Sequence, residues 1–358
     1  MASYKRFVQI GMALDPIHVG TGGARIGRVD LTIVRDPVTR VPKIPGSSLA
    51  GVYRTYVAMH YKENPQQQIH QASQSGQQFQ GGQKPYYPDC AGLGLNKNRG
   101  HCRHPDCPIC TVFGFARGAG QEGGFAGLAA FTDAHVLLFP VPTRQGPMWI
   151  TSPMVLEMIG LTVSGVSDNA VYGENAGNPL NLGWLLLETR QCGEMSKITS
   201  QLQTLGVPDY IRNRLALVPD RLFAHIVDSN LEVRTSVSIN PVTGAAEEGA
   251  LFSYEALPRG TVLVWEIIAK NPAHFRIGGQ DIKAVSSSDD IHNVTKQAHA
   301  YLEHLGIGGM GTRGMGRLKV VYSNALTTKG SASCQRSQPS EQSTASEAEQ
   351  SHGEPGHE

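Results

Sequence analysis

Residues 306–317 read GIGGMGTRGMGR, and they stand between a predicted helix and a predicted strand. A backbone without Cβ atoms can come close to a phosphate and offer its N–H groups, and Arg313 and Arg317 add positive charge. A dinucleotide-binding loop has the opposite order, because it follows a strand and opens a helix. The stretch is therefore either a mobile turn or a surface for an RNA backbone, and its arginines favour RNA. The RNA contacts that we predict in it are Gly308, Gly309, Gly311, Arg313, Gly314 and Arg317.

The segments around this stretch predict a mixture of strands and helices. Short apolar runs predict strands at Phe7–Leu14, His135–Val141, Leu180–Leu187, Thr261–Ala269 and Arg317–Tyr322. Apolar residues at helical spacing predict helices that begin at Ser47, as the cap, and that span Glu194–Leu205, Pro208–Val218 and Asp290–Leu305. There is no strand–helix repeat of the barrel type, so the fold class is α+β.

Composition points to an ordinary globular protein. The chain has 358 residues, of which 17% are charged and 40% are hydrophobic, enough to bury a sizeable core. No apolar run approaches the length of a membrane span, and the start of the chain, MASYKRFVQI, lacks the features of a signal peptide. We therefore expect a cytoplasmic protein with no membrane partner.

Two segments are too polar to form a core. Residues 325–358 are rich in Ser, Gln, Glu and Gly and predict a disordered tail, which leaves a single domain over residues 1–324. Removing the two basic and five acidic residues of this tail leaves 29 basic against 25 acidic side chains, a small excess that allows an RNA partner without requiring one. Residues 64–84 predict a flexible glutamine-rich loop in an insertion at about 61–114.

The cysteines predict a metal site in the same insertion. Three of the six cysteines fall within residues 102–110, and clustered cysteines in a reducing compartment usually bind metal, although buried or redox-active thiols are the alternative. Four such ligands hold zinc tetrahedrally and can stabilise a loop that has no core of its own. The ligands that we predict for a structural Zn²⁺ are Cys90, Cys102, Cys107 and Cys110, with His101 or His104 as alternatives to Cys90.

Two further segments are candidates for RNA contacts. Ser47 and Ser48 stand at a predicted helix N-terminus, where N–H groups and hydroxyls can hold a phosphate, and plain capping explains them equally well. Residues 234–260 predict a protruding β-hairpin, in which Phe252 is either an apolar wedge between bases or an ordinary core residue. Arg234 lies at its start.

Five stretches occur in the order found in the RAMP superfamily of CRISPR proteins, which the chain resembles. They are IHVGTG (17–22), GRVDLTIVRDPVTRVPKIPGSSLAGVYR (27–54), CPICTVFG (107–114), LFSYEALPRGT (251–261) and GIGGMGTRGMGR (306–317). The likeness is greatest to the backbone subunits of type III effectors, and FTDAHVLLFPV (131–141) and the chain length favour the Cmr type over the Csm type. It spans nearly the whole ordered chain.

This resemblance implies a ferredoxin-like core, similar to an RNA-recognition motif, with a zinc-binding loop and a β-hairpin thumb. It implies a prokaryotic subunit that binds guide crRNA and target RNA. The partners that it implies are copies of the same chain, other RAMP subunits, a large polymerase-like subunit and a small helical subunit. Arg54 would bind RNA one turn after SSLAG, where the family commonly has SSLKG, so Ala50 removes a possible lysine contact.

The resemblance also implies an endoribonuclease. Asp30 matches the aspartate implicated in target cleavage, with Mg²⁺ or another divalent ion, and His18 and Glu255 would lie near the scissile phosphate. A 2′-hydroxyl can attack the adjacent phosphate when a distorted nucleotide reaches an in-line arrangement. From the residues alone, Asp30 reads more simply as a turn or capping acid. Alternatives are a scaffold that binds crRNA without cutting and a zinc-stabilised interaction protein that makes no RNA contact.

Overall fold

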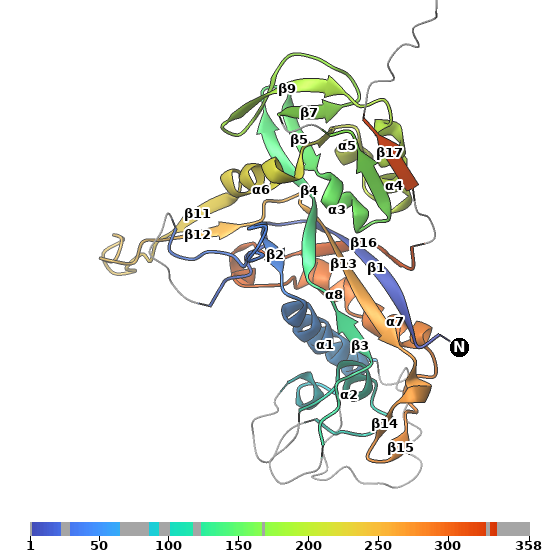
Figure 1. Ribbon diagram of the computed structural model, residues 1–358. Coiled ribbons are helices and arrows are strands. Elements are labelled where there is room, and N and C mark those ends of the chain that lie inside the picture. Colours follow the sequence, from blue (N-terminus) through green and yellow to red (C-terminus); the bar gives the residue numbers. More distant parts are fainter. Residues whose placement is uncertain are drawn as a thin grey trace, which may run out of the picture.

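The computed structural model describes residues 2–22, 29–64, 86–92, 101–116, 123–166, 169–326 and 330–334. Nearly all of the predicted glutamine-rich loop, and the end of the chain from residue 335, lie outside these residues. Figure 1 shows a lower and an upper half joined by one long strand, β4 (Ala134–Thr143). The first half of β4 pairs with β13 and the second half with β5, so a single sheet of eleven strands runs through both halves.

The lower half is built on four antiparallel strands in the order β16, β1, β13, β4. Their bounds are β1 Tyr4–Ala13, β13 Val262–Lys270 and β16 Leu318–Asn324, with the short strands β2 (Lys43–Ile44) and β3 (Ala129–Phe131) paired at the side. The helices that pack on this sheet are α1 (Gly46–Glu63), α2 (Pro108–Phe113), α7 (Ser288–Lys296) and α8 (His299–His304). Leu49, Tyr53 and Val57 of α1 are fully buried, because they lie on one face at helical spacing.

The upper half continues the sheet from β4 in the order β5, β10, β7, β9, β8. Their bounds are β5 Gly146–Thr151, β10 Leu215–Leu217, β7 Ala170–Gly173, β9 Leu185–Gln191 and β8 Leu180–Leu182. The helices of this half are α3 (Pro153–Glu157), α4 (Met195–Thr204), α5 (Asp209–Arg212) and α6 (Asp220–Ser229). A separate pair, β6 (Leu161–Ser164) and β17 (Gly330–Ser333), is parallel, and a disulfide joins Cys192 to Cys334 beside it.

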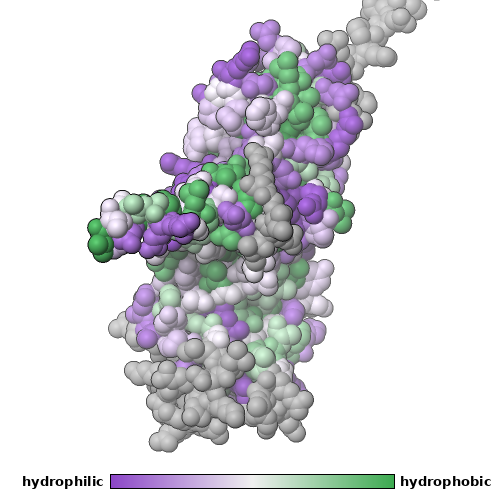
Figure 2. Space-filling model, turned by 90° about the vertical axis from the view of Figure 1, so that its left-hand side faces the viewer, coloured by the Kyte–Doolittle hydropathy of each residue, from purple (hydrophilic) through white to green (hydrophobic). Residues whose placement is uncertain are grey.

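A two-stranded hairpin, β11 (Glu232–Ser236) and β12 (Phe252–Ala256), projects from the molecule between the two halves (Figure 1). Asn240 builds its turn by accepting the N–H of Val242 at 2.9 Å through its side chain and that of Gly244 at 2.8 Å through its carbonyl. Val242 is 91% exposed, and Figure 2 shows hydrophobic residues at the free end of the hairpin. The predicted hairpin is confirmed.

Several predicted elements are wrong in detail. The strand at Leu180–Leu187 is two strands, because Gly183 turns the chain at φ +64°. The helix at Pro208–Val218 ends at Arg212, and the fully apolar run Leu215–Leu217 is a buried strand instead. Residues 330–334, predicted to belong to a disordered tail, contain β17 and the disulfide-bonded Cys334, whose pairing partners are far away in the sequence.

Short elements complete the described chain. They are the 3-10 helices Asp89–Ala91, Pro272–His274 and Gly311–Arg313 and the strand pair β14 (Arg276–Ile277) and β15 (Gln280–Asp281). The predicted helix over Asp290–Leu305 is present as α7 followed by α8. No helix among the described residues is long and apolar enough to cross a membrane.

Candidate nucleic-acid interface and metal centre

Three segments that are distant in the sequence meet at the root of the β11–β12 hairpin. Residues 14–22 and 29–35 form backbone bridges to β12 and the residue after it and to the glycine-rich loop. These bridges join Ile17 to Leu257, Leu31 to Tyr254 and His18 to Gly309. The predicted residues Asp30, His18, Glu255 and Phe252 therefore lie on adjoining segments.

Asp30 is exposed, yet its side chain is fixed by Ser253 of β12. The Ser253 N–H donates to Asp30 Oδ2 at 2.7 Å and the Ser253 hydroxyl donates to the same oxygen at 2.9 Å, while the Asp30 N–H donates to Ser253 Oγ at 3.2 Å. The backbone N–H of Ser253, followed by its hydroxyl, lowers the pKa of Asp30. Asp30 is therefore a carboxylate at neutral pH, and its Oδ1 has no hydrogen-bond partner in the described part of the chain.

Glu255 is held in an ion pair. Its Oε2 lies 2.9 Å from Nη2 of Arg35 and accepts the N–H of Ile33 at 3.3 Å, and Arg35 also donates to Asp228 at 3.1 Å. The Glu255 side chain is only 13% exposed. It therefore fastens the segment that follows Asp30 to the hairpin.

His18 braces the glycine-rich loop. Its Nδ1 lies 2.6 Å from the carbonyl oxygen of Glu255, and because a carbonyl only accepts, Nδ1 carries the proton. The ring is 6% exposed, and a Cβ on Gly20 would lie 2.9 Å from Nε2. A Cβ on Gly308 would lie 2.3 Å from the His18 carbonyl oxygen, and φ there is +89°, so glycine is required at position 308.

The glycine-rich loop is anchored at several points. The N–H of Gly309 donates to the His18 carbonyl at 2.8 Å, and that of Gly316 donates to the Pro16 carbonyl at 2.9 Å. The Tyr56 hydroxyl donates to the Gly306 carbonyl at 2.6 Å. Between these anchors Gly308, Gly309, Gly311, Arg313 and Gly314 are exposed. The loop is thus held in place by these hydrogen bonds, while the residues between Gly306 and Gly316 remain largely exposed.

Two arginines of this loop differ in their partners. Arg313 lies over the ring of Phe252 at 5.6 Å and has no carboxylate partner in the described part of the chain. Arg317 makes two hydrogen bonds to Asp15, at 2.5 and 3.1 Å, which lower the pKa of Asp15. Arg313 is therefore available to a phosphate, whereas Arg317 is already paired.

Two other arginines lie near the same place. The positive charge of Arg259 and, to a smaller extent, that of Arg234 also lower the pKa of Asp15. Both arginines therefore lie near Asp15. Arg234 pairs with Glu232 at 2.6 Å. Arg259, which is exposed, was missed in the sequence analysis, because an arginine in a turn carries no signal there.

The predicted phosphate site at the start of α1 is occupied by a carboxylate. Helix α1 begins at Gly46, and Asp133 accepts the Gly46 N–H at 2.8 Å, while Lys43 pairs with Asp133 at 2.7 Å. Ser47 does not cap the helix, because the N-cap residue is Pro45. Ser47 is exposed and Ser48 is half-buried. A phosphate would have to displace Asp133 to reach the first N–H.

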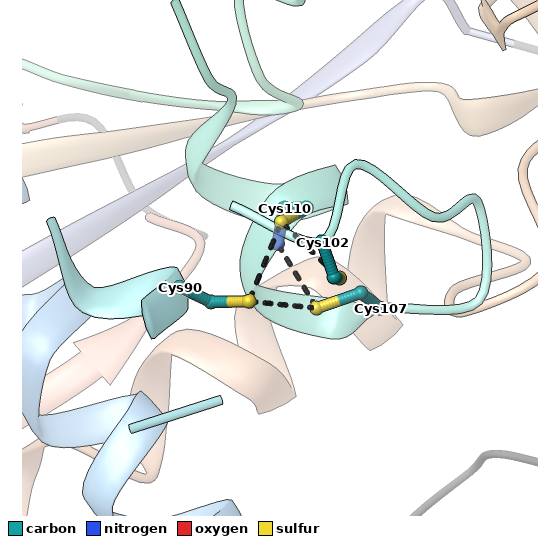
Figure 3. Close-up of side chains that lie close together, drawn as sticks. All are labelled: Cys90, Cys102, Cys107 and Cys110. Atoms are coloured by element: carbon teal, nitrogen blue, oxygen red, sulfur yellow. Dashed lines mark hydrogen bonds between the residues drawn. The ribbon is translucent and has the colours of Figure 1, made fainter. Parts of the chain in front are cut away.

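The four predicted cysteines lie together in the lower half (Figure 3). Their sulfurs are all within 4.8 Å of one another, and three pairs of sulfurs are 3.7, 3.9 and 3.7 Å apart. Zn–S bonds of about 2.3 Å in a tetrahedron put the sulfurs about 3.8 Å apart. Cys90, Cys107 and Cys110 are fully buried. The donor set and spacing fit a metal ion.

Arg54 supports this cluster. It donates to the carbonyl oxygens of Cys90 at 2.7 Å and of Gly114 at 2.6 Å, and it lies 2.9 Å from Nδ1 of His101. Burial lowers the pKa of Arg54. Burial and the charge of Arg54 also lower the pKa of His101, so His101 is a neutral acceptor. Its Nδ1 is therefore occupied by Arg54.

His104 is engaged as well, because its Nδ1 lies 3.2 Å from a carboxylate oxygen of Asp106. The fourth member of the cluster in the described residues is Cys90.

Comparison with known proteins gives one family. Residues 12–319 match the RAMP superfamily. The chain is 26% identical over 337 residues to the CRISPR system Cmr endoribonuclease Cmr4 of Pyrococcus furiosus, and the match covers 88% of this chain and 95% of the relative. It is 44% identical over 59 residues to the CRISPR system Cms endoribonuclease Csm3 of Enterococcus italicus, which covers 16% and 28% of the two chains.

A solved structure shares the fold. A chain of the type III-B Cmr-beta complex bound to cognate target RNA superposes with a TM-score of 0.56 at 14% identity, over 90% of this chain and 98% of that chain. At this identity the likeness concerns the fold alone.

Proposed function

The chain belongs to the RAMP superfamily, and from this premise we propose that it is a crRNA-binding backbone subunit of a type III CRISPR effector that cleaves base-paired target RNA. The names of its relatives, Cmr and Csm endoribonucleases, support this function. The observation that carries it is the placement of Asp30. An ionised, exposed carboxylate stands at the root of a projecting hairpin, beside the glycine-rich loop and Arg313.

Asp30 Oδ1 acts on the attacking hydroxyl. A carboxylate with a lowered pKa is a weak base at neutral pH, so its main contribution is to accept a hydrogen bond from the 2′-hydroxyl and hold it in line with the phosphate. Arg313 offsets the charge that develops on the phosphate, and the exposed N–H groups of the loop bind the backbone. Phe252, over which Arg313 lies, is the base contact of the hairpin root.

The remaining predicted residues have supporting roles in this proposal. His18 and Glu255 hold the loop and the Asp30 segment in place, and Arg317 and Arg234 contribute through their positive charge at the edge of the surface. Ser47 and Ser48 bind a phosphate only if the RNA replaces Asp133. Arg54, with its guanidinium directed to the cysteine cluster, is reassigned from RNA binding to that cluster.

The cysteine cluster holds a structural Zn²⁺ in this proposal. Four thiolates, with Cys90 as the fourth, give zinc a closed tetrahedral site without room for a reactive water. Zinc would supply cross-links between Cys90 and the 102–110 segment, on either side of residues 93–100.

A divalent ion for cleavage remains a prediction. Around Asp30 the described residues offer no group of three metal-ligating side chains, so an ion there would be held mainly by Asp30 and the RNA phosphate. Cleavage assays with Mg²⁺ titrated against a chelator test it.

The sheet supports a ferredoxin-like core. The order β16, β1, β13, β4, all antiparallel, with α1 between β1 and β4 and with α7 and α8 between β13 and β16, is the order that this core requires. We propose a single domain that extends past the predicted end at residue 324 to include β17 and Cys334, and of which the hairpin is the thumb. Its partners are crRNA, target RNA, further copies of the chain, other RAMP subunits, a large polymerase-like subunit and a small helical subunit, in the prokaryotic cytoplasm.

One experiment separates cleavage from scaffolding. The complex is reconstituted with guide RNA and a labelled complementary target, and wild type is compared with Asp30→Asn. We expect equal RNA affinity and loss of the cleavage products in the variant. Unchanged cleavage in the variant would remove the catalytic role from Asp30, absence of cleavage by the wild-type complex would leave the chain as a non-catalytic crRNA-binding scaffold, and an absence of salt-dependent RNA affinity would remove both RNA functions.

A further inference from the structure

Ser253 holds Asp30 through a reciprocal pair of contacts. The Ser253 hydroxyl accepts the N–H of Asp30 at 3.2 Å and donates to Asp30 Oδ2 at 2.9 Å. The Ser253 N–H makes a second donation to the same carboxylate oxygen at 2.7 Å. Backbone and side chain of Asp30 are thus fixed by one residue, and Oδ1 is left for a ligand.

The backbone next to Asp30 continues this attachment. The Leu31 N–H donates to the Ser253 carbonyl at 3.1 Å, and the Glu255 N–H donates to the Leu31 carbonyl at 3.0 Å. This is a short parallel bridge, so the Asp30 segment lies along β12 like an added strand. The carboxylate therefore has its position set by the hairpin.

From these contacts we infer that Ser253 is a positioning residue for target cleavage. It fixes the Asp30 carboxylate to the root of the thumb, so that the distance between the carboxylate and the thumb stays constant. The inference rests on the proposed function. In the proposed cleavage, the attacking 2′-hydroxyl has to meet Asp30 Oδ1 within hydrogen-bond range. A carboxylate carried by a freely rotating side chain would meet it in only a fraction of the molecules.

The side chain of Ser253 has the reach that this role needs. A serine or threonine hydroxyl can both accept from Asp30 N–H and donate to Oδ2, whereas alanine retains only the backbone donor. The variant Ser253→Ala therefore removes one of two donors to Oδ2 and leaves the strand pairing intact. Ser236, on the other strand of the hairpin, has no side-chain hydrogen bond in the described part of the chain, so Ser236→Ala is a matched control.

Single-turnover cleavage by reconstituted complexes tests the inference. We expect Ser253→Ala to lower the cleavage rate about tenfold at neutral pH with RNA affinity within about twofold of wild type, and Ser253→Thr and Ser236→Ala to keep the wild-type rate. Loss of one donor to the carboxylate also moves the acidic limb of the pH–rate profile of Ser253→Ala to higher pH.

The outcomes separate this inference from the proposed function. A wild-type rate and pH profile in Ser253→Ala, together with an inactive Asp30→Asn, overturns the inference alone. Full activity in Asp30→Asn overturns the proposed cleavage itself. A rate loss in Ser253→Ala that comes with an equal loss of RNA affinity, and that Ser253→Thr does not restore, overturns the positioning role, because the residue then maintains the hairpin rather than Asp30.

Discussion

Replacing Arg54 by methionine separates the two roles that sequence and structure give this residue. The sequence resemblance assigns Arg54 to RNA, whereas its guanidinium donates to the carbonyl oxygens of Cys90 and Gly114 beside the cysteine cluster. Methionine keeps most of the length of the side chain and removes the charge and every donor. The change therefore addresses the hydrogen bonds with little change in packing.

The expected effect follows from two short charged hydrogen bonds. Each hydrogen bond from a charged donor is worth about 1.5–3 kcal/mol, and the lower value applies because Arg54 is only half-buried. Two bonds give about 3 kcal/mol, which corresponds to roughly 100-fold in an equilibrium constant. The loss concerns the local opening of the cysteine cluster at both Cys90 and the 102–114 segment, through which zinc would leave its thiolate ligands. A cluster of four thiolates and Zn²⁺ carries two negative charges, so removal of the Arg54 cation acts in the same direction.

The assay follows the transfer of zinc to a chromophoric chelator after zinc content has been measured. We expect release from Arg54→Met to be roughly 100-fold faster than from wild type, with Arg54→Lys in between. Arg313→Met is the matched control, because Arg313 lies on the proposed RNA surface beside Phe252, and this variant should release zinc at the wild-type rate. Wild-type zinc release together with weakened RNA affinity in Arg54→Met would refute the reassignment and restore the RNA role.

Three further outcomes are expected. Burial lowers the pKa of His292 to about 4 and that of His299 to about 3, so between about pH 4 and 6.5 both bind protons only when the chain unfolds. In this range stability should fall with falling pH by up to about 1.4 kcal/mol per pH unit for each histidine, and His299→Leu should flatten a urea-melt pH series. Reducing Cys192–Cys334, which closes a loop of sequence separation 142, should lower the free energy of unfolding by up to about 5 kcal/mol; thermal melts with a phosphine reductant check this, and Cys334→Ser should not respond. Arg313→Gln should reduce the slope of log affinity against log salt by about one in RNA filter binding, and an unchanged slope would remove Arg313 from the phosphate contacts.

Local patterns predicted the elements whose environment is encoded nearby. The run Thr261–Ala269 is apolar except for Thr261 and Glu266 and supplies most of β13, and the α1 stripe is buried as its spacing requires. The helix predicted over Pro208–Val218 is wrong beyond Arg212, because the apolar residues there are compatible with a helix and with a buried strand equally well. Only the pairing of Leu215–Leu217 with β5 and β7 decides for the strand.

The candidate site was predictable only in part, because its contacts are non-local. Asp30 was selected from the resemblance, and no short-range pattern distinguishes it from a turn acid. Its partner Ser253 lies 223 residues away, so the hydrogen bonds that fix the carboxylate have no signature in either segment. The same holds for Arg54, whose helical position gives the direction of the side chain but not the carbonyl of Cys90 that it meets.

The partners of the predicted catalytic residues limit the chemistry that this surface can perform. His18 is buried with Nδ1 on a carbonyl, and Glu255 is paired with Arg35, so the proposed mechanism gives both residues a supporting role and assigns neither of them the proton transfer. In the described part of the chain Asp30 Oδ1 is then the acceptor that RNA can meet. A lone carboxylate with a lowered pKa gives only modest acid–base catalysis. In the proposed mechanism most of the rate therefore comes from in-line geometry of the attacking hydroxyl, which makes the spacing between the hairpin and Asp30 the quantity that matters most for the proposed cleavage.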